Sequence, residues 1–78
     1  MPEILQLDIH GQICPSCLLL TLKALNEQAS RLRAGALEIL VLTDDRQATA
    51  TIPEAAQRMG YRSEVTQDAE GYRIHIHA

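Results

Sequence analysis

The sequence predicts an α/β (α+β) two-layer sandwich, in which a four-stranded mixed sheet has two helices on one face. Three observations predict it. Apolar residues first alternate at the period of a strand, then repeat at the period of a helix, and an unbroken aliphatic run follows. The element order obtained in this way is β-α-β-α-β-β. With 78 residues the chain can build one core only, so we expect a single domain over residues 1–78.

The first two elements are a half-buried strand and an amphipathic helix. Over residues 4–10, leucine and isoleucine alternate with polar residues, which is typical of a strand with one covered face. A single apolar stripe at spacings of three and four predicts the helix. The stripe consists of Leu18, Leu22, Leu25, Ala29 and Leu32. We expect Leu19 and Leu20 to widen this stripe, and Gly35 to form a left-handed cap behind the helix.

The remaining elements complete the sheet and add the second helix. Residues 37–42 are an aliphatic run too short for a helix, which predicts a central strand parallel to the first. Residues 51–54 (Thr-Ile-Pro-Glu) fit a capping box with proline in the first turn, so we expect the second helix to begin there. Residues 61–66 and 72–77 predict a hairpin around the turn at 68–71.

One face of the predicted sheet has no helix to cover it, because two helices can cover only the other. Most side chains expected on this open face are polar, namely Gln6, Asp8, Glu38, Arg73, His75 and His77. Leu40 and Leu42 are expected there too. They either form a surface for a partner or a second copy, or belong to a central strand that is simply apolar on both sides.

Composition and charge exclude several classes of protein. The net charge is −3, no run of Lys or Arg occurs, and the only aromatic residues are two tyrosines, which argues against direct binding of nucleic acid. No stretch approaches the roughly 20 apolar residues of a membrane span. The N-terminus lacks the basic and apolar regions of a signal peptide. We therefore expect a cytoplasmic protein that binds neither nucleic acid nor membrane.

Cys14 and Cys17 are the candidate catalytic residues. They are the only cysteines and stand three residues apart, too close for a disulfide that would stabilise the fold appreciably. Pro15 suits the first position of a helix, so we expect Cys14 at the N-cap and Cys17 at the third helical position. The free N–H groups and the helix dipole would then favour the thiolate of Cys14, which is the nucleophilic form.

Other interpretations of the cysteine pair stay open at this point. A Cys-x-x-Cys spacing suits a redox pair, half of a zinc site, or two cysteines without chemistry. Either cysteine could be a buried, inert residue, and for Cys17 this is the more serious alternative because its helical position could face the core.

Further side chains could complete a metal site, but their expected positions argue against it. His10, His75 and His77 are expected on the open face of the sheet, whereas the helix that begins near the cysteines covers the other face. Asp44 and Asp45 are better explained as loop residues than as cation ligands or a catalytic acid. We therefore expect no metal and no cofactor.

Residues 7–15 (Leu-Asp-Ile-His-Gly-Gln-Ile-Cys-Pro) resemble the strand-to-helix signature of the TusA/SirA family of small sulfur carriers. Similar matches continue along the chain at residues 22–25, 35–41, 43–45, 52–53 and 60–61. The resemblance implies the fold of the C-terminal domain of translation initiation factor three. It also implies that Cys14 accepts persulfide sulfur from a cysteine desulfurase or a rhodanese-like donor. A downstream acceptor protein would then take the sulfur, for tRNA thiolation, cofactor assembly or sulfur oxidation.

Three residues depart from the family pattern. Cys17 replaces the second proline of Cys-Pro-x-Pro, His10 replaces an arginine, and Thr51 replaces an aspartate. Attack by Cys17 on a Cys14 persulfide would release sulfide and leave a disulfide. The resemblance and the cysteine pair together predict a sulfurtransferase-like relay protein with Cys14 as carrier and Cys17 as a resolving or auxiliary thiol. Two alternatives stay open, a thiol–disulfide redox module and a non-enzymatic interaction or regulatory domain.

Overall fold

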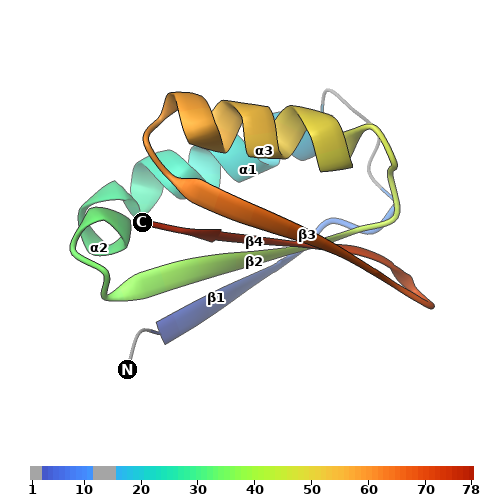
Figure 1. Ribbon diagram of the computed structural model, residues 1–78, viewed down its shortest axis with the longest axis horizontal. Helices are drawn as coiled ribbons and strands as arrows, with labels where there is room; N and C mark the ends of the chain where they lie inside the picture. Colours follow the sequence, from blue (N-terminus) through green and yellow to red (C-terminus); the bar gives the residue numbers. More distant parts are fainter. Residues whose placement is uncertain (1–2, 12–15) are drawn as a thin grey trace.

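A mixed sheet with helices packed on one face forms the fold, which confirms the predicted fold class (Figure 1). The computed structural model describes residues 3–11 and 16–78, except for the side chain of Cys17. The elements in chain order are β1 (Glu3–Asp8), α1 (Ser16–Glu27), α2 (Ala29–Arg33), β2 (Leu37–Thr43), α3 (Ala48–Arg58), β3 (Arg62–Asp68) and β4 (Gly71–His77). No helix in these ranges is long and apolar enough to cross a membrane.

The strand order in the sheet is β1-β2-β4-β3. β1 pairs with β2 in parallel, as the sequence predicts for strands joined by a helical crossover, while β4 pairs antiparallel with both β2 and β3. The register aligns Leu5 with Ile39 and Ile39 with Ile76, so apolar side chains form a row across the sheet. Asp68 faces Gly71 at the predicted hairpin turn.

The core lies between the helices and the covered face of the sheet. Every second residue of β2 is buried, and Ile74 and Ile76 of β4 are buried with them. The buried apolar residues are Ile9, Leu25, Leu32, Leu37, Ile39, Val41, Ala48, Ile52, Ala56, Tyr61, Ile74 and Ile76. Full burial of one such aliphatic side chain stabilises a fold by about 1.5–3 kcal/mol, so this aliphatic layer is the main source of stability.

The predicted first helix differs from the structure in two ways. It is divided into α1 and α2 at Gln28, whose φ of −106° and ψ of 15° lie outside the helical range. The expectation that Leu19 and Leu20 widen the buried stripe is wrong, since their exposed fractions are 61% and 41%. Successive residues of a helix point about 100° apart, which turns both leucines away from the face that Leu25 buries.

The predicted start of the second helix is also wrong. α3 begins at Ala48, and Pro53 lies inside the helix rather than in its first turn. The buried face explains the longer helix, because Ala48, Ile52 and Ala56 follow one another at spacings of four and have no exposed surface. Burial of this face therefore outweighs the loss of the one intrahelical bond that Pro53 cannot donate.

The predicted capping box at Thr51 is likewise wrong. The hydroxyl of Thr51 donates to the backbone oxygen of Gln47 over 3.2 Å, as a threonine inside a helix does. At the true start of α3, the Asp45 carboxylate accepts the N–H of Gln47 over 3.0 Å. Asp45 thus satisfies a backbone group just before the helix, which places it in a structural role within the loop.

Candidate functional site

The two predicted site residues belong to the junction between β1 and α1. Cys14 lies outside the described residues, and so does its predicted position at the N-cap. Cys17 is the second residue of α1, with its side chain likewise outside the described part. Both catalytic roles therefore stay predictions. The described residues that flank this junction, Gly11 on one side and Ser16 on the other, are both exposed.

Three connections meet at the end of the sheet to which this junction belongs (Figure 1). The parallel strands β1 and β2 both end there, since Asp8 is in register with Leu42. The hairpin between β3 and β4 turns at the same end, because Thr43 is in register with Tyr72. The carboxyl ends of parallel strands are the usual place for reactive groups in open α/β sheets. The connection from β1 to α1, which contains Cys14 in the sequence, thus starts at an edge of the sheet where reactive groups are usually found.

A side chain of the neighbouring connection holds the turn after β1. The last regular ladder bond runs from the N–H of Ile9 to the oxygen of Leu42 over 2.8 Å. The N–H of Gly11 then donates to Oδ1 of Asp44 over 3.1 Å. Gly11 has a φ of 83°, a left-handed conformation that glycine adopts without steric cost. Asp44 therefore has a defined contact in the loop rather than being a merely solvated residue.

His10 is paired with a carboxylate at the end of β1. Its Nδ1 lies 2.6 Å from Oδ1 of Asp8, and the same oxygen accepts its backbone N–H over 3.1 Å. The hydrogen bond with Asp8 raises the pKa of His10, and the charge of Asp44 and the backbone of Glu70 add to the rise. The same bond lowers the pKa of Asp8. The contact with Asp8 therefore favours the protonated form of His10, which stands four residues before Cys14 in the sequence.

The hairpin turn packs closely against the connection that carries Asp44. A Cβ on Gly71 would lie 2.5 Å from the backbone oxygen of Thr43 and 3.2 Å from Cα of Asp44. The hydroxyl of Thr43, which is fully buried, accepts the N–H of Asp45 over 3.1 Å. The three connections are thus joined by hydrogen bonds and close backbone packing.

The structure does not bring the three histidines together. His75 and His77 lie on the uncovered side of β4, as predicted, with ring centroids 5.1 Å apart. Nε2 of His75 is 2.5 Å from Oε1 of Glu38, whereas His10 pairs with Asp8. Within residues 3–11 and 16–78, no group of three or more His, Cys, Asp or Glu side chains is arranged to hold a metal ion.

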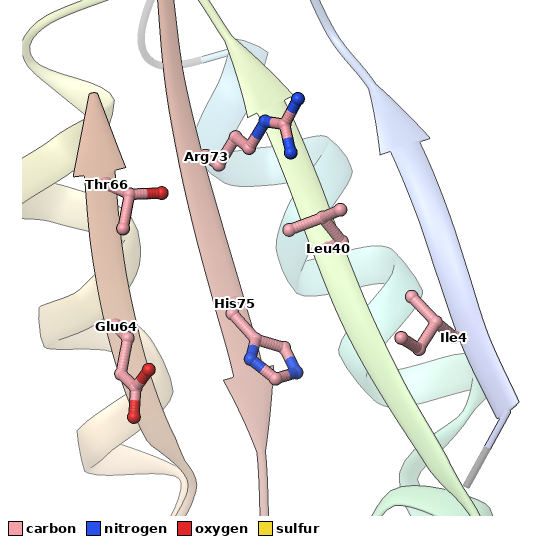
Figure 2. Close-up of a pocket in the computed structure, with 6 residues that line it drawn as sticks. All are labelled: Ile4, Leu40, Glu64, Thr66, Arg73 and His75. Carbon is pink, nitrogen blue, oxygen red and sulfur yellow. The ribbon is translucent and has the colours of Figure 1, made fainter. Parts of the chain in front are cut away.

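A groove of about 300 Å³ runs along the open face of the sheet, as Figure 2 shows. Its lining residues are Ile4, Leu40, Glu64, Thr66, Arg73 and His75. Leu40 and Leu42 are half-buried, whereas Ile4 has an exposed fraction of 58%. Ile4 was not predicted on this face, although it alternates in step with Gln6 and Asp8.

The exposed leucines of α1 form a second apolar feature, close to Cys17 in the chain. Leu19 belongs to the first turn of α1 and Leu20 follows it. A separate groove of about 310 Å³ lies between α1 and α3. It is lined by Leu18, Leu22, Thr51, Glu54, Ala55 and Arg58. An apolar surface at the start of the helix that follows Cys14 is suited to contact with another protein.

Comparison with known proteins adds one finding to this geometry. The model of the family described as sulfurtransferase TusA matches residues 5–78. The matched range contains both cysteines and all three connections at the end of the sheet. No individually curated protein matches the chain.

Proposed function

The chain belongs to the TusA sulfurtransferase family, and from that premise we propose that it relays sulfur as a persulfide on Cys14. Membership of this family makes the chain a sulfur carrier, whereas the persulfide chemistry on Cys14 is the finer part that we propose. The observation that carries the finer proposal is that the family match includes the Cys14-Pro15 step directly before α1. A cysteine at the start of a helix has a thiolate favoured by the helix dipole.

Loading begins when the Cys14 thiolate attacks the terminal sulfur of a persulfide on a donor protein. A new S–S bond forms on Cys14, the S–S bond of the donor breaks, and the donor leaves as a thiolate. The donor would be a cysteine desulfurase or a rhodanese-like protein. An acceptor protein takes the sulfur by the same exchange in reverse order, so the relay needs no external oxidant or reductant.

The exposure of the surrounding residues supports exchange between two proteins. His10, Gly11 and Asp44 are all exposed, as is Ser16 at the start of α1. A carrier of this kind needs its sulfur accessible to a larger partner rather than enclosed. The exposed Leu19 supplies apolar surface for that partner close to the cysteine segment.

Cys17 gives the carrier a second possible fate, which we include in the proposal. Its thiolate attacks the Sγ atom of the Cys14 persulfide, the bond to the outer sulfur breaks, and hydrosulfide leaves. The product is a Cys14–Cys17 disulfide, so the outer sulfur is reduced while the two cysteines are oxidised. Cys17 would thereby limit the lifetime of the carried sulfur.

Mass spectrometry after incubation with a cysteine desulfurase and free cysteine tests the proposal. We expect the mass of one added sulfur atom on the wild type and on Cys17→Ser, and none on Cys14→Ser. The adduct should persist longer on Cys17→Ser than on the wild type. Urea unfolding of Cys14→Ser should match the wild type, which shows that the loss is chemical.

The same samples separate the rival functions. Absence of added sulfur from both the wild type and Cys17→Ser, with a donor that loads another carrier, would contradict the relay. Recovery of the wild type as the disulfide, with no sulfur adduct on Cys17→Ser either, would instead favour the thiol–disulfide redox module. An unchanged adduct lifetime on Cys17→Ser would remove Cys17 from the mechanism.

A further inference from the structure

We propose that Asp44 is a positioning residue for the reactions of Cys14. Its carboxylate holds the turn at Gly11, from which the chain runs on to Cys14. The proposal deepens the proposed function and rests on it. In this role Asp44 acts through the backbone of Gly11.

The contact between Gly11 and Asp44 extends the hydrogen-bond ladder between β1 and β2. In a parallel pair, every second N–H of one strand donates to the neighbouring strand. The N–H of Ile9 donates to the backbone oxygen of Leu42, so the next partners in this series are Gly11 and Asp44. The N–H of Gly11 does donate to Asp44, but to side-chain Oδ1 over 3.1 Å. The carboxylate thus continues the ladder one step beyond the regular strands.

The described residues give Gly11 little packing support. Gly11 is exposed, and apart from its chain neighbours no described residue places a heavy atom within 4 Å of the point that a Cβ would occupy. Within residues 3–11 and 16–78, the contact that holds Gly11 is therefore the bond to Asp44. A hydrogen bond to a charged acceptor is stronger than one to a neutral acceptor. The carboxylate of Asp44 is therefore well suited to hold an exposed turn.

In contrast to Gly11, Asp44 belongs to a backbone segment that its neighbours hold in place. The preceding residue, Thr43, is fully buried, and its hydroxyl binds the N–H of Asp45 over 3.1 Å. The hairpin supports the same backbone from the other side, since a Cβ on Gly71 would collide with the oxygen of Thr43. A positioning residue is effective when its own location is fixed in this way.

Loss of the Asp44 charge and loss of the Asp44 contact to Gly11 would change the pKa of the Cys14 thiol in opposite directions. The two effects can therefore be told apart. A nearby carboxylate disfavours a thiolate, so loss of charge alone would lower the thiol pKa. A misplaced turn would draw the sulfur away from the helix start, and the thiol pKa would rise. Asp44→Ala removes both charge and acceptor, whereas Asp44→Asn keeps a side-chain oxygen acceptor and removes only the charge.

The experiment compares these variants in a Cys17→Ser background, where Cys14 is the only cysteine. Two reactions are followed, sulfur loading by a desulfurase with cysteine and alkylation by iodoacetamide across pH. For Asp44→Ala we expect loading slowed about 3- to 10-fold, the effect of losing one hydrogen bond of ordinary net strength. We also expect the midpoint of its alkylation profile to shift to higher pH. Asp44→Asn should load at nearly the parent rate, without that upward shift.

Asp68→Ala is the matched control. Asp68 is also an exposed turn residue of this end, and its carboxylate accepts the N–H groups of Glu70 and Gly71 over 2.9 and 3.0 Å. It also binds Arg73, so its removal breaks three hydrogen bonds at this turn. If general loss of loop structure slowed Cys14, Asp68→Ala would slow it at least as much. We expect Asp68→Ala to react at the parent rate.

An NMR measurement checks the physical step directly. The amide proton of Gly11 should move upfield in Asp44→Ala, since its hydrogen bond is lost, and should move less in Asp44→Asn. Parent-like loading and alkylation by Asp44→Ala, equal slowing by Asp44→Asn, or equal slowing by Asp68→Ala would each overturn the proposal. If no protein takes up sulfur, the proposed relay fails, and the alkylation profiles still decide the role of Asp44.

Discussion

One oxygen of Asp8 accepts two hydrogen bonds from His10, from Nδ1 at 2.6 Å and from the backbone N–H at 3.1 Å. The side-chain bond raises the pKa of His10 and lowers that of Asp8. The contact therefore favours the carboxylate of Asp8 and the protonated imidazole of His10 at the end of β1. The charge that His10 contributes to this end of the sheet therefore depends on pH.

The first prediction concerns this pH dependence. Asp8→Asn should lower the pKa of His10 toward its ordinary value near 6.5, which an NMR titration of the imidazole would measure. The pairing stabilises the fold in full above the pKa of unfolded aspartate and below that of unfolded histidine. It is lost as pH rises through the raised pKa of His10, or falls through the lowered pKa of Asp8.

Urea unfolding at several pH values provides the second half of that test. The difference in unfolding free energy between the wild type and Asp8→Asn should be largest at weakly acidic pH and smaller on either side. A difference that stays constant from pH 4 to pH 9 would show that the pair does not couple to folding.

The second prediction concerns the contact between the hairpin and Thr43. Gly71→Ala places a Cβ 2.5 Å from the Thr43 backbone oxygen at a φ of 145°, so both collision and backbone strain oppose it. Gly35→Ala is the matched control, because Gly35 has a φ of 76° and open space around it. Strain alone should cost Gly35→Ala about 1–2 kcal/mol of unfolding free energy. Gly71→Ala should lose clearly more in urea unfolding, and an equal loss would argue against the collision.

The third prediction concerns the core side of α1. Leu25→Ala should lower the unfolding free energy by about 2–5 kcal/mol, because Leu25 has no exposed surface. Leu20→Ala changes the same residue type in the same helix at an exposed fraction of 41%, and should cost much less. Urea unfolding of both variants measures the contrast, and similar losses would place Leu20 in the core after all.

The fourth prediction concerns the exposed leucine in the first turn of α1. Leu19→Glu should slow sulfur uptake from a desulfurase but not from a low-molecular-weight persulfide, because only the protein donor needs this apolar contact. Val65→Glu on β3 changes another exposed apolar residue, with an exposed fraction of 42%, and serves as the control. If both variants accept sulfur from the enzyme at the wild-type rate, Leu19 is not part of the docking surface.

Periodicity predicted the sheet well because its signal is local. The alternation in β4 correctly assigned Ile74 and Ile76 to the core and His75 to the open face. Periodicity did not predict which side chains are buried where several apolar residues follow one another in a helix. In the run Leu18–Leu20, only the packing of α1 on the sheet decides which leucines are buried.

The site was predictable only in part, because its contacts join distant residues. The Cys14-Pro15 step predicts a reactive thiol from the sequence alone, and this stays a prediction because both residues lie outside the described part. The bond between Asp44 and Gly11 joins residues 33 positions apart, and nothing in the local sequence distinguishes Asp44 from an ordinary loop residue. The structured role of Asp44 therefore emerged only once β1 was paired with β2.

β1 is an edge strand, and five of its six residues are exposed. It has one neighbour in the sheet, whereas β2 has two. Detaching β1 would therefore break one ladder and leave the β2–β4–β3 sheet intact. Amide hydrogen exchange should show β1 opening at a lower free energy than β2, as a local rather than a global unfolding event. The strand that leads the chain toward Cys14 is thus one of the two edge strands, which a partner protein can remodel without breaking the central β2–β4 pair.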